Sequence, residues 1–369
     1  MAFDVHRTGP GRSQQLVRRH VPPPVLIGAV CGLAWAASLR AVMAQFAGAE
    51  SHFDWVGTYE GVLLPGAVVG GLLGWAACRH GRSARTAWWL VAAPQVFVVA
   101  TPTVVVSVFD DGLGGGALAV PLVGMAGGYA LAGRGPRWTR WATGVVAILA
   151  VPGWLVAASV IGGPLALDTA RGAWLAVLFL SLLAVLGFGC TLPYRAPAEL
   201  LTSRRRLVLV GVICGLAWSA GMRGFMAAAT DTPSHVSWLG TFGIILLFGA
   251  VVGGLLGWAE YLRRSGDGRR QRRLVAAPLA FTVDPASLMV TLPALAGGYA
   301  LSGRGSRRGR WLATVAALLP VPAFLVAVLV LADIRDLLTP GGAWMVVLLF
   351  SHLAVLTIAS VIPQRETAA

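Results

Sequence analysis

The chain has 369 residues, of which 57% are hydrophobic and only 12% are charged, and its mean hydropathy is +0.75. Soluble domains usually contain about 45–50% apolar and about 25% charged residues, so these values exclude an ordinary soluble domain and a disordered chain. The formal net charge is +14, from 29 basic residues, all of them arginine, against 15 acidic ones. In a soluble protein such an excess would suggest nucleic acid, so the positions of the arginines decide its meaning.

Apolar runs long enough to cross about 30 Å of hydrocarbon recur along the whole chain. Ten are clear: residues 25–46, 56–78, 87–109, 113–131, 141–161, 173–192, 207–228, 238–259, 311–331 and 343–362. Residues 274–302 form a further apolar stretch, broken near its middle by Asp284-Pro285. One straight helix of that length would overshoot the bilayer, whereas two full crossings would need about 40 residues.

Arginine placement decides between these alternatives. If residues 274–302 enter the membrane and return, 25 of the 29 arginines fall on one side. A single crossing would instead export Arg304, Arg307, Arg308 and Arg310. Because loops that keep arginine are cytoplasmic, we predict an all-α protein of the cell membrane with both termini in the cytoplasm and no nucleic-acid partner. It has about twelve transmembrane segments, of which the ninth and tenth are short or re-entrant.

The chain contains an internal repeat. CGLAW at 31–35 recurs at 214–218, and GAVVGGLLGW at 66–75 recurs unchanged at 249–258, so these two matches share one offset. AGGYAL at 126–131 recurs at 296–301, with a slightly shorter offset. We therefore predict two parallel six-helix repeats, related by an axis along the membrane normal. The expected order is an arginine-rich cytoplasmic tail (1–24), the first repeat (25–195), a cytoplasmic linker (196–206), the second repeat (207–364) and a short tail (365–369).

Glycines dominate what the two copies share. They lie four residues apart on one helix face: Gly66, Gly70 and Gly74, with the copies Gly249, Gly253 and Gly257. Such ladders of small residues let a neighbouring backbone approach closely. We expect them to pack helices of this chain together or to bind a partner membrane protein.

Both copies also keep a polar cluster near the outer surface. Arg40 and Arg223 lie near the outer ends of their segments, about 9 Å deeper than the interface. The next loop and helix start supply the other candidate binding residues: His52, Trp55 and Thr58, with the copies His235, Trp238 and Thr241. A guanidinium beside the free N–H groups of a helix start suits a phosphate or carboxylate. The alternative is that the arginines snorkel, the tryptophans belong to the interfacial belt and the histidines cap turns.

Two further ionisable residues are candidates for ligand binding. His352 lies near the middle of the last segment, where the first copy has Leu182, and is a candidate for a proton relay or a ligand contact. The alternative is a neutral imidazole bonded to a neighbouring helix. Asp284 could mark a discontinuous helix that lines a cavity, although an exposed polar turn explains it equally well.

Motifs for catalysis are missing from the sequence. It has no nucleophile elbow, no zinc-binding histidine pair and no phosphate-binding glycine loop. We therefore expect no enzyme activity, no metal and no cofactor. The pattern favours a transporter or permease that lies in the lipid bilayer and binds an anionic or amphipathic small molecule or lipid between its two halves. The alternative is a non-transporting scaffold or partner subunit.

The plan of two parallel six-helix repeats resembles the major facilitator superfamily. That family has a glycine, an Asp-Arg pair, a second glycine and basic residues after its second helix. Gly74, Arg79, Gly81 and Arg82 match this frame, with Cys78 at the aspartate position. The string Ser-His-x-x-Trp-x-Gly-Thr at 51–58 and 234–241 is similar to uncharacterised multi-pass membrane proteins of GC-rich bacteria. This second resemblance implies a membrane location and no particular activity.

Overall fold

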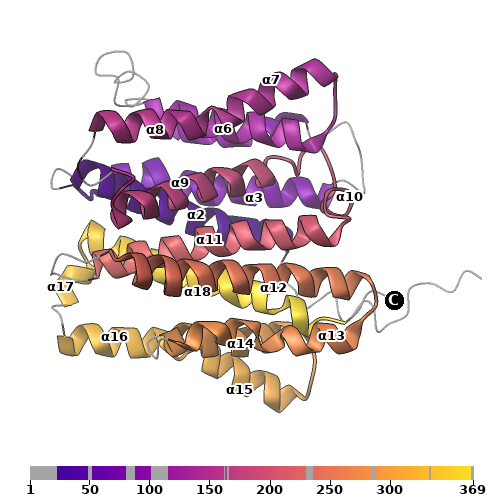
Figure 1. Ribbon diagram of the computed structural model, residues 1–369. Helices are drawn as coiled ribbons and strands as arrows, with labels where there is room; N and C mark the ends of the chain where they lie inside the picture. The colour runs from indigo at the N-terminus through magenta and orange to yellow at the C-terminus, as the bar shows by residue number, and fades with distance from the viewer. Residues whose placement is uncertain are drawn as a thin grey trace, which may run out of the picture.

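The computed structural model describes residues 23–48, 52–79, 88–100, 115–161, 163, 166–229, 236–283, 287–331 and 334–366. In these ranges all regular structure is helical, and the long helices lie side by side with their axes roughly aligned (Figure 1). The first half contains α2 (Pro24–Ala47), the π-helix η2 (Trp55–Leu63), α3 (Leu64–Arg79), the 3-10 helix η4 (Trp88–Gln95), α4 (Val96–Ala100), α6 (Gly115–Ala132), α7 (Arg137–Ile148), α8 (Ala150–Ile161), α9 (Ala170–Gly189) and α10 (Pro197–Leu200). The second half contains α11 (Arg204–Ala228), the π-helix η6 (Trp238–Leu246), α12 (Leu247–Arg264), α13 (Gly268–Arg273), the 3-10 helix η7 (Leu274–Val283), α14 (Leu288–Leu301), α15 (Arg307–Leu318), α16 (Pro320–Leu331), α17 (Ile334–Leu337), α18 (Pro340–Ser360) and the 3-10 turn η9 (Ile362–Gln364).

Eight stretches of helix are long and apolar enough to cross a membrane. They are Pro24–Ala47, Trp55–Arg79, Arg137–Val160, Ala170–Gly189, Arg204–Ala228, Trp238–Arg264, Arg307–Ala327 and Pro340–Gln364. Three shorter apolar helices accompany them, Trp89–Ala100, Leu118–Ala132 and Leu288–Leu301. The chain is therefore an all-helical, polytopic membrane protein. The twelve segments expected from the sequence stay a prediction, because eight full-length spans lie in the described residues.

The expected third and ninth segments both begin as 3-10 helices rather than α-helices. Each contains a proline, Pro94 in η4 and Pro278 in η7, which lacks an N–H and disfavours the α-helix. After η4 and α4, residues 101–114 lie outside the described ranges. Similarly, η7 ends at Val283 and α14 begins at Leu288, so the break expected near Asp284 falls between two helices, although residues 284–286 are not described.

Two broken helices form the flanks of the molecule. In Figure 1, α7 and α8 lie along the top edge, and α15 and α16 along the bottom edge. Each break precedes a proline, Pro152 or Pro320, that the first turn of the next helix tolerates. Only 11% of the apolar window of Arg137–Val160 and 0% of that of Arg307–Ala327 is buried in the protein. These flanking helices therefore present apolar side chains to the lipid.

The core of the protein is formed by α2, α9, α11 and α18. α2 packs against α18, α11 packs against α9, and α2 and α11 also contact each other. The side chains of Trp174, Leu175, Leu178 and Leu348, on α9 and α18, are completely buried here. Figure 1 shows the same arrangement, with α11 and α18 in the middle of the stack and the flanking helices outermost.

Glycines set the distance between neighbouring helices. A Cβ added to Gly70 on α3 would overlap the carbonyl oxygen of Gly28 on α2, and one added to Gly66 would overlap the side chain of Ala36. The second half repeats this contact, because a Cβ on Gly253 of α12 would overlap the carbonyl oxygen of Gly211 on α11. The ladder glycines are thus used inside the chain, where they let two backbones touch.

We predict that Gly70→Ala lowers the free energy of unfolding by about 1–3 kcal/mol, because the new methyl group has no room between α2 and α3. Gly71→Ala is the matched control. It lies on the same helix, gains the same helix propensity, and its Cβ would meet no atom closer than 3.7 Å. Denaturant unfolding in detergent micelles measures both variants, and equal stability of the two would contradict this packing.

Candidate functional site

The Arg40 guanidinium is buried near the end of α2 that leads to η2. The side chain is only 7% exposed. Its Nε donates to Oγ1 of Thr58 at 3.4 Å, and one terminal nitrogen donates to the backbone carbonyl of His52 at 2.8 Å. The guanidinium carbon lies 4.0 Å from the centre of the Phe53 ring. Hydrogen bonds and an aromatic face together compensate for much of the cost of burying this charge.

A π-helix brings Thr58 to the arginine. η2 begins at Trp55, and the preceding Asp54 caps it by accepting the backbone N–H of Gly57. Thr58 is completely buried in the first turn. The Asp54 carboxylate also interacts electrostatically with Arg40. Because π-helices are rare and cluster at functional sites, an arginine held by the start of one marks this end of the protein as a candidate binding site.

The second half places Arg223 in a related setting with different partners. Arg223 on α11 is 5% exposed, and its guanidinium carbon lies 5.7 Å from the centre of the Trp174 ring on α9. The π-helix η6 again buries a threonine, Thr241, and its cap is Ser237, whose hydroxyl accepts the N–H of Gly240 at 3.1 Å. This cap carries no charge, so the two arginines differ in their electrostatic surroundings.

The structure brings some of the expected residues together and separates others. Arg40, Thr58 and the backbone of His52 meet, whereas the His52 side chain is exposed. Trp55 and Trp238 are more than half exposed, and each ring packs against the aromatic residue one turn later in its own helix. These tryptophans therefore match the interfacial alternative. His235 and Asp284, the remaining candidates of this group, lie outside the described residues.

His352 joins α18 to α2 in the core. Its side chain is 2% exposed, with Nε2 3.1 Å from Oγ of Ser38 and Nδ1 2.8 Å from the carbonyl oxygen of Leu348. Because a carbonyl only accepts, a neutral imidazole carries its proton on Nδ1 and accepts the Ser38 hydroxyl at Nε2. The hydroxyl has a second acceptor within reach, the carbonyl of Ala34 at 3.0 Å, so it can turn away when Nε2 takes up a proton.

Two tryptophans tie the halves of the chain together. The indole N–H of Trp174 on α9 donates to the carbonyl of Ala220 on α11 at 3.1 Å. Reciprocally, the indole N–H of Trp344 on α18 donates to the carbonyl of Ala37 on α2 at 3.1 Å. Each bond crosses from the last long helix of one half to the first helix of the other. The buried arginines and His352 therefore lie along the same junction.

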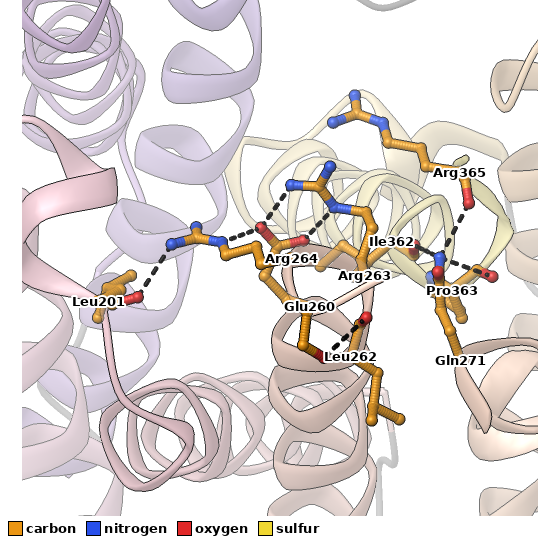
Figure 2. Close-up of polar contacts among 10 residues, drawn as sticks. Leu201, Glu260, Leu262, Arg263, Arg264, Gln271, Ile362, Pro363 and Arg365 are labelled. Atoms are coloured by element: carbon orange, nitrogen blue, oxygen red, sulfur yellow. Dashed lines mark hydrogen bonds and ion pairs between the residues drawn. The ribbon is translucent and has the colours of Figure 1, made fainter. Parts of the chain in front are cut away.

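The arginine-rich end of the protein holds a cluster that the sequence reasoning missed (Figure 2). Glu260 on α12 accepts hydrogen bonds from Arg263 and Arg264, with distances of 2.7 and 2.8 Å to Arg263 and 2.7 Å to Arg264. Gln271 on α13 donates its side-chain amide to backbone carbonyls of residues 362, 363 and 365. The spacing of three and four positions between Glu260 and the arginines was a signal for this cluster.

Comparison with known proteins assigns no family to this chain: no family model, no curated protein and no solved structure matches it. Within the described residues, no group of three or more His, Cys, Asp or Glu side chains is arranged to hold a metal ion.

We predict that Trp174→Phe and Trp344→Phe each lower the free energy of unfolding by about 0.5–1.5 kcal/mol, because each removes a buried hydrogen bond between the two halves. Trp311→Phe is the control, since Trp311 is 66% exposed on a flanking helix. Denaturant unfolding in detergent micelles provides the comparison. Loss of the same stability in all three variants would contradict a specific role for the junction bonds.

Proposed function

We propose that this membrane protein is a transporter or permease that binds an anionic or amphipathic small molecule or lipid between two helical halves. The observation that carries this proposal is the burial of Arg40 against the first turn of a π-helix. An arginine in this position costs free energy that helix packing alone does not require. A guanidinium that contacts a threonine hydroxyl at the start of a helix is suited to a carboxylate or phosphate.

The proposal includes two parallel six-helix repeats, and matched contacts support it. The cap of η2 by Asp54 corresponds to the cap of η6 by Ser237, at the offset of the GAVVGGLLGW match. The cap of α9 by Thr169 corresponds to that of α18 by Thr339, at the offset of the AGGYAL match. The reciprocal tryptophan bonds follow the same two offsets. Halves related in this way form a symmetric junction, where many transporters bind their substrates.

The two halves differ at their buried ionisable residues, and these differences support different roles for the halves in binding. Arg40 has the nearby carboxylate of Asp54, whereas the equivalent cap beside Arg223 is the uncharged Ser237. His352 of the second half is bonded to Ser38, and its counterpart in the first half is Leu182. We propose that the Arg223 side favours an anion more strongly and that His352 couples binding to protonation.

The arginine-rich end, with α10, α13 and the C-terminus, faces the cytoplasm in this proposal.

A second candidate function is a non-transporting scaffold. The observation that favours it is the exposed apolar surface of α15 and α16, which packs little against the rest of the protein. A partner membrane helix could cover this surface instead of lipid. The glycine ladders would take no part, because they already pack α2 against α3 and α11 against α12.

We predict that Arg40→Gln and Arg223→Gln remove an anionic species that co-purifies with the wild-type protein, with occupancy reduced about tenfold or more. Native mass spectrometry from mild detergent measures the bound species, and flux of the identified species into liposomes measures transport. Arg171→Gln is the control. Arg171 lies at the same end of the protein and bonds to Gln45, on α2 one turn beyond Arg40. Unchanged spectra and flux in both variants would contradict the binding site and favour the scaffold.

His352→Leu is a second variant for the same flux measurement. It places at position 352 the leucine that the first half has at the corresponding position, Leu182. If His352 couples binding to protonation, the pH dependence of flux disappears while Ser38 keeps its bond to Ala34. An unchanged pH profile would contradict the coupling and leave the arginine site intact.

A further inference from the structure

Three arginines surround a single carboxylate where α12 and the C-terminal turn η9 meet. Arg263 and Arg264 belong to the last turn of α12, and Arg365 directly follows η9 (Figure 2). With Glu260 between them, the group carries a net charge of +2. Both elements close candidate membrane spans, Trp238–Arg264 and Pro340–Gln364, so the cluster lies where a bilayer has its headgroups.

Glu260 fixes two of the arginines in place. Arg263 gives it two hydrogen bonds, of 2.7 and 2.8 Å, and the other N–H groups of this guanidinium form no hydrogen bond to a described residue. Arg264 gives it one bond of 2.7 Å and donates another to the carbonyl of Leu201 in the linker, at 2.9 Å. All three charged side chains are largely buried, at 16 to 31% exposure. Three hydrogen bonds to the carboxylate thus orient the two guanidinium groups.

Arg365 is held in this cluster by its backbone rather than by its side chain. The buried amide of Gln271 donates to the carbonyl of Arg365 at 2.9 Å. Within the described residues, the Arg365 guanidinium forms no hydrogen bond or ion pair, and Figure 2 shows it pointing away from Gln271 on the same side as Arg263. Burial and the charge of Arg263 lower the pKa of Arg365, and Glu260 only partly offsets them. Glu366 is exposed and forms no ion pair with any described residue.

We propose that Arg263, Arg264 and Arg365 bind the phosphate group of an anionic phospholipid. Guanidinium groups match phosphate oxygens with paired hydrogen bonds, and a phosphate would supply the charge that Glu260 alone does not. Basic pockets between the ends of spanning helices are suited to anionic headgroups. The position at two span ends favours a lipid phosphate over a soluble one. This site is separate from the proposed Arg40 site.

The first half of the chain provides a natural comparison. Arg195 corresponds to Arg365 at the offset of the AGGYAL match. At the offset of the GAVVGGLLGW match, however, Ala77, His80 and Gly81 stand where the second half has Glu260, Arg263 and Arg264. The first half therefore keeps one arginine of the cluster and lacks the carboxylate that orients the other two. We expect the lipid site in the second half alone.

The test compares Arg365→Gln with Arg195→Gln in the full-length protein purified in mild detergent. Each protein is titrated with phosphatidylglycerol, phosphatidylcholine and inorganic phosphate, and native mass spectrometry reports the bound lipid. We expect the wild type to prefer phosphatidylglycerol over phosphatidylcholine, and Arg365→Gln to bind phosphatidylglycerol at least about fivefold more weakly. Arg195→Gln should bind as the wild type does. Arg365→Gln is suitable because the side chain loses no bond to a described residue, and its Tm without lipid should be unchanged.

Three results would overturn the proposal. The first is equal affinity for phosphatidylglycerol in the wild type and Arg365→Gln. The second is equal binding of phosphatidylcholine and phosphatidylglycerol to the wild type, which would exclude recognition of the anionic headgroup. The third is a rise in Tm with inorganic phosphate as large as with phosphatidylglycerol, which would assign the cluster to a soluble anion.

Discussion

The direct contact of helix backbones at glycine is the constraint on which this structure depends. In a membrane, hydrocarbon tails are as apolar as leucine, so apolar burial alone does not hold helices together. Gly28 and Gly70, and likewise Gly211 and Gly253, let α2 lie against α3 and α11 against α12 without intervening side chains. These two tightly packed pairs can then carry polar groups between them, because the helices that hold the groups are fixed in position.

The polar groups of the junction are satisfied within this framework. The bonds of Trp174 and Trp344 connect the halves reciprocally, and His352 bonds across to Ser38. Buried polar groups with partners specify one arrangement of helices, since each wrong arrangement leaves a donor or acceptor unpaired. Arg40 and Arg223 differ from these groups in kind, because a full charge costs more to bury than packing requires. Their burial is the physical reason for proposing a binding site at this junction.

Hydropathy, arginine placement and self-comparison predicted much of this arrangement. They located the long helices and the role of the glycine ladders in packing, and they placed Arg40 beside Thr58. For Trp55 and Trp238 the sequence left two interpretations open, a binding site and the interfacial belt, because hydropathy does not distinguish a face that meets lipid from one that meets protein. Their exposure matches the interfacial belt. The 3-10 form of η7 was missed although its cause, Pro278, is visible in the sequence. The cluster around Glu260 was missed because it depends on which helix ends come together in space, and the repeat gives no guide to Glu260 because the first half has Ala77 there.

Disulfide cross-linking of α2 to α11 tests the central claim most directly, because the two helices meet through small residues. A Cβ on Gly221 would lie 3.3 Å from Cβ of Ser38, close to the separation that a disulfide requires. In a variant whose native cysteines are replaced by serine and whose linker carries a protease site, Ser38→Cys with Gly221→Cys should keep the two fragments joined on a non-reducing gel after oxidation and cleavage. Gly254→Cys in place of Gly221→Cys should not, because position 254 faces Val212. Separation of the fragments in the first pair, or joining in both, would contradict a direct junction between α2 and α11.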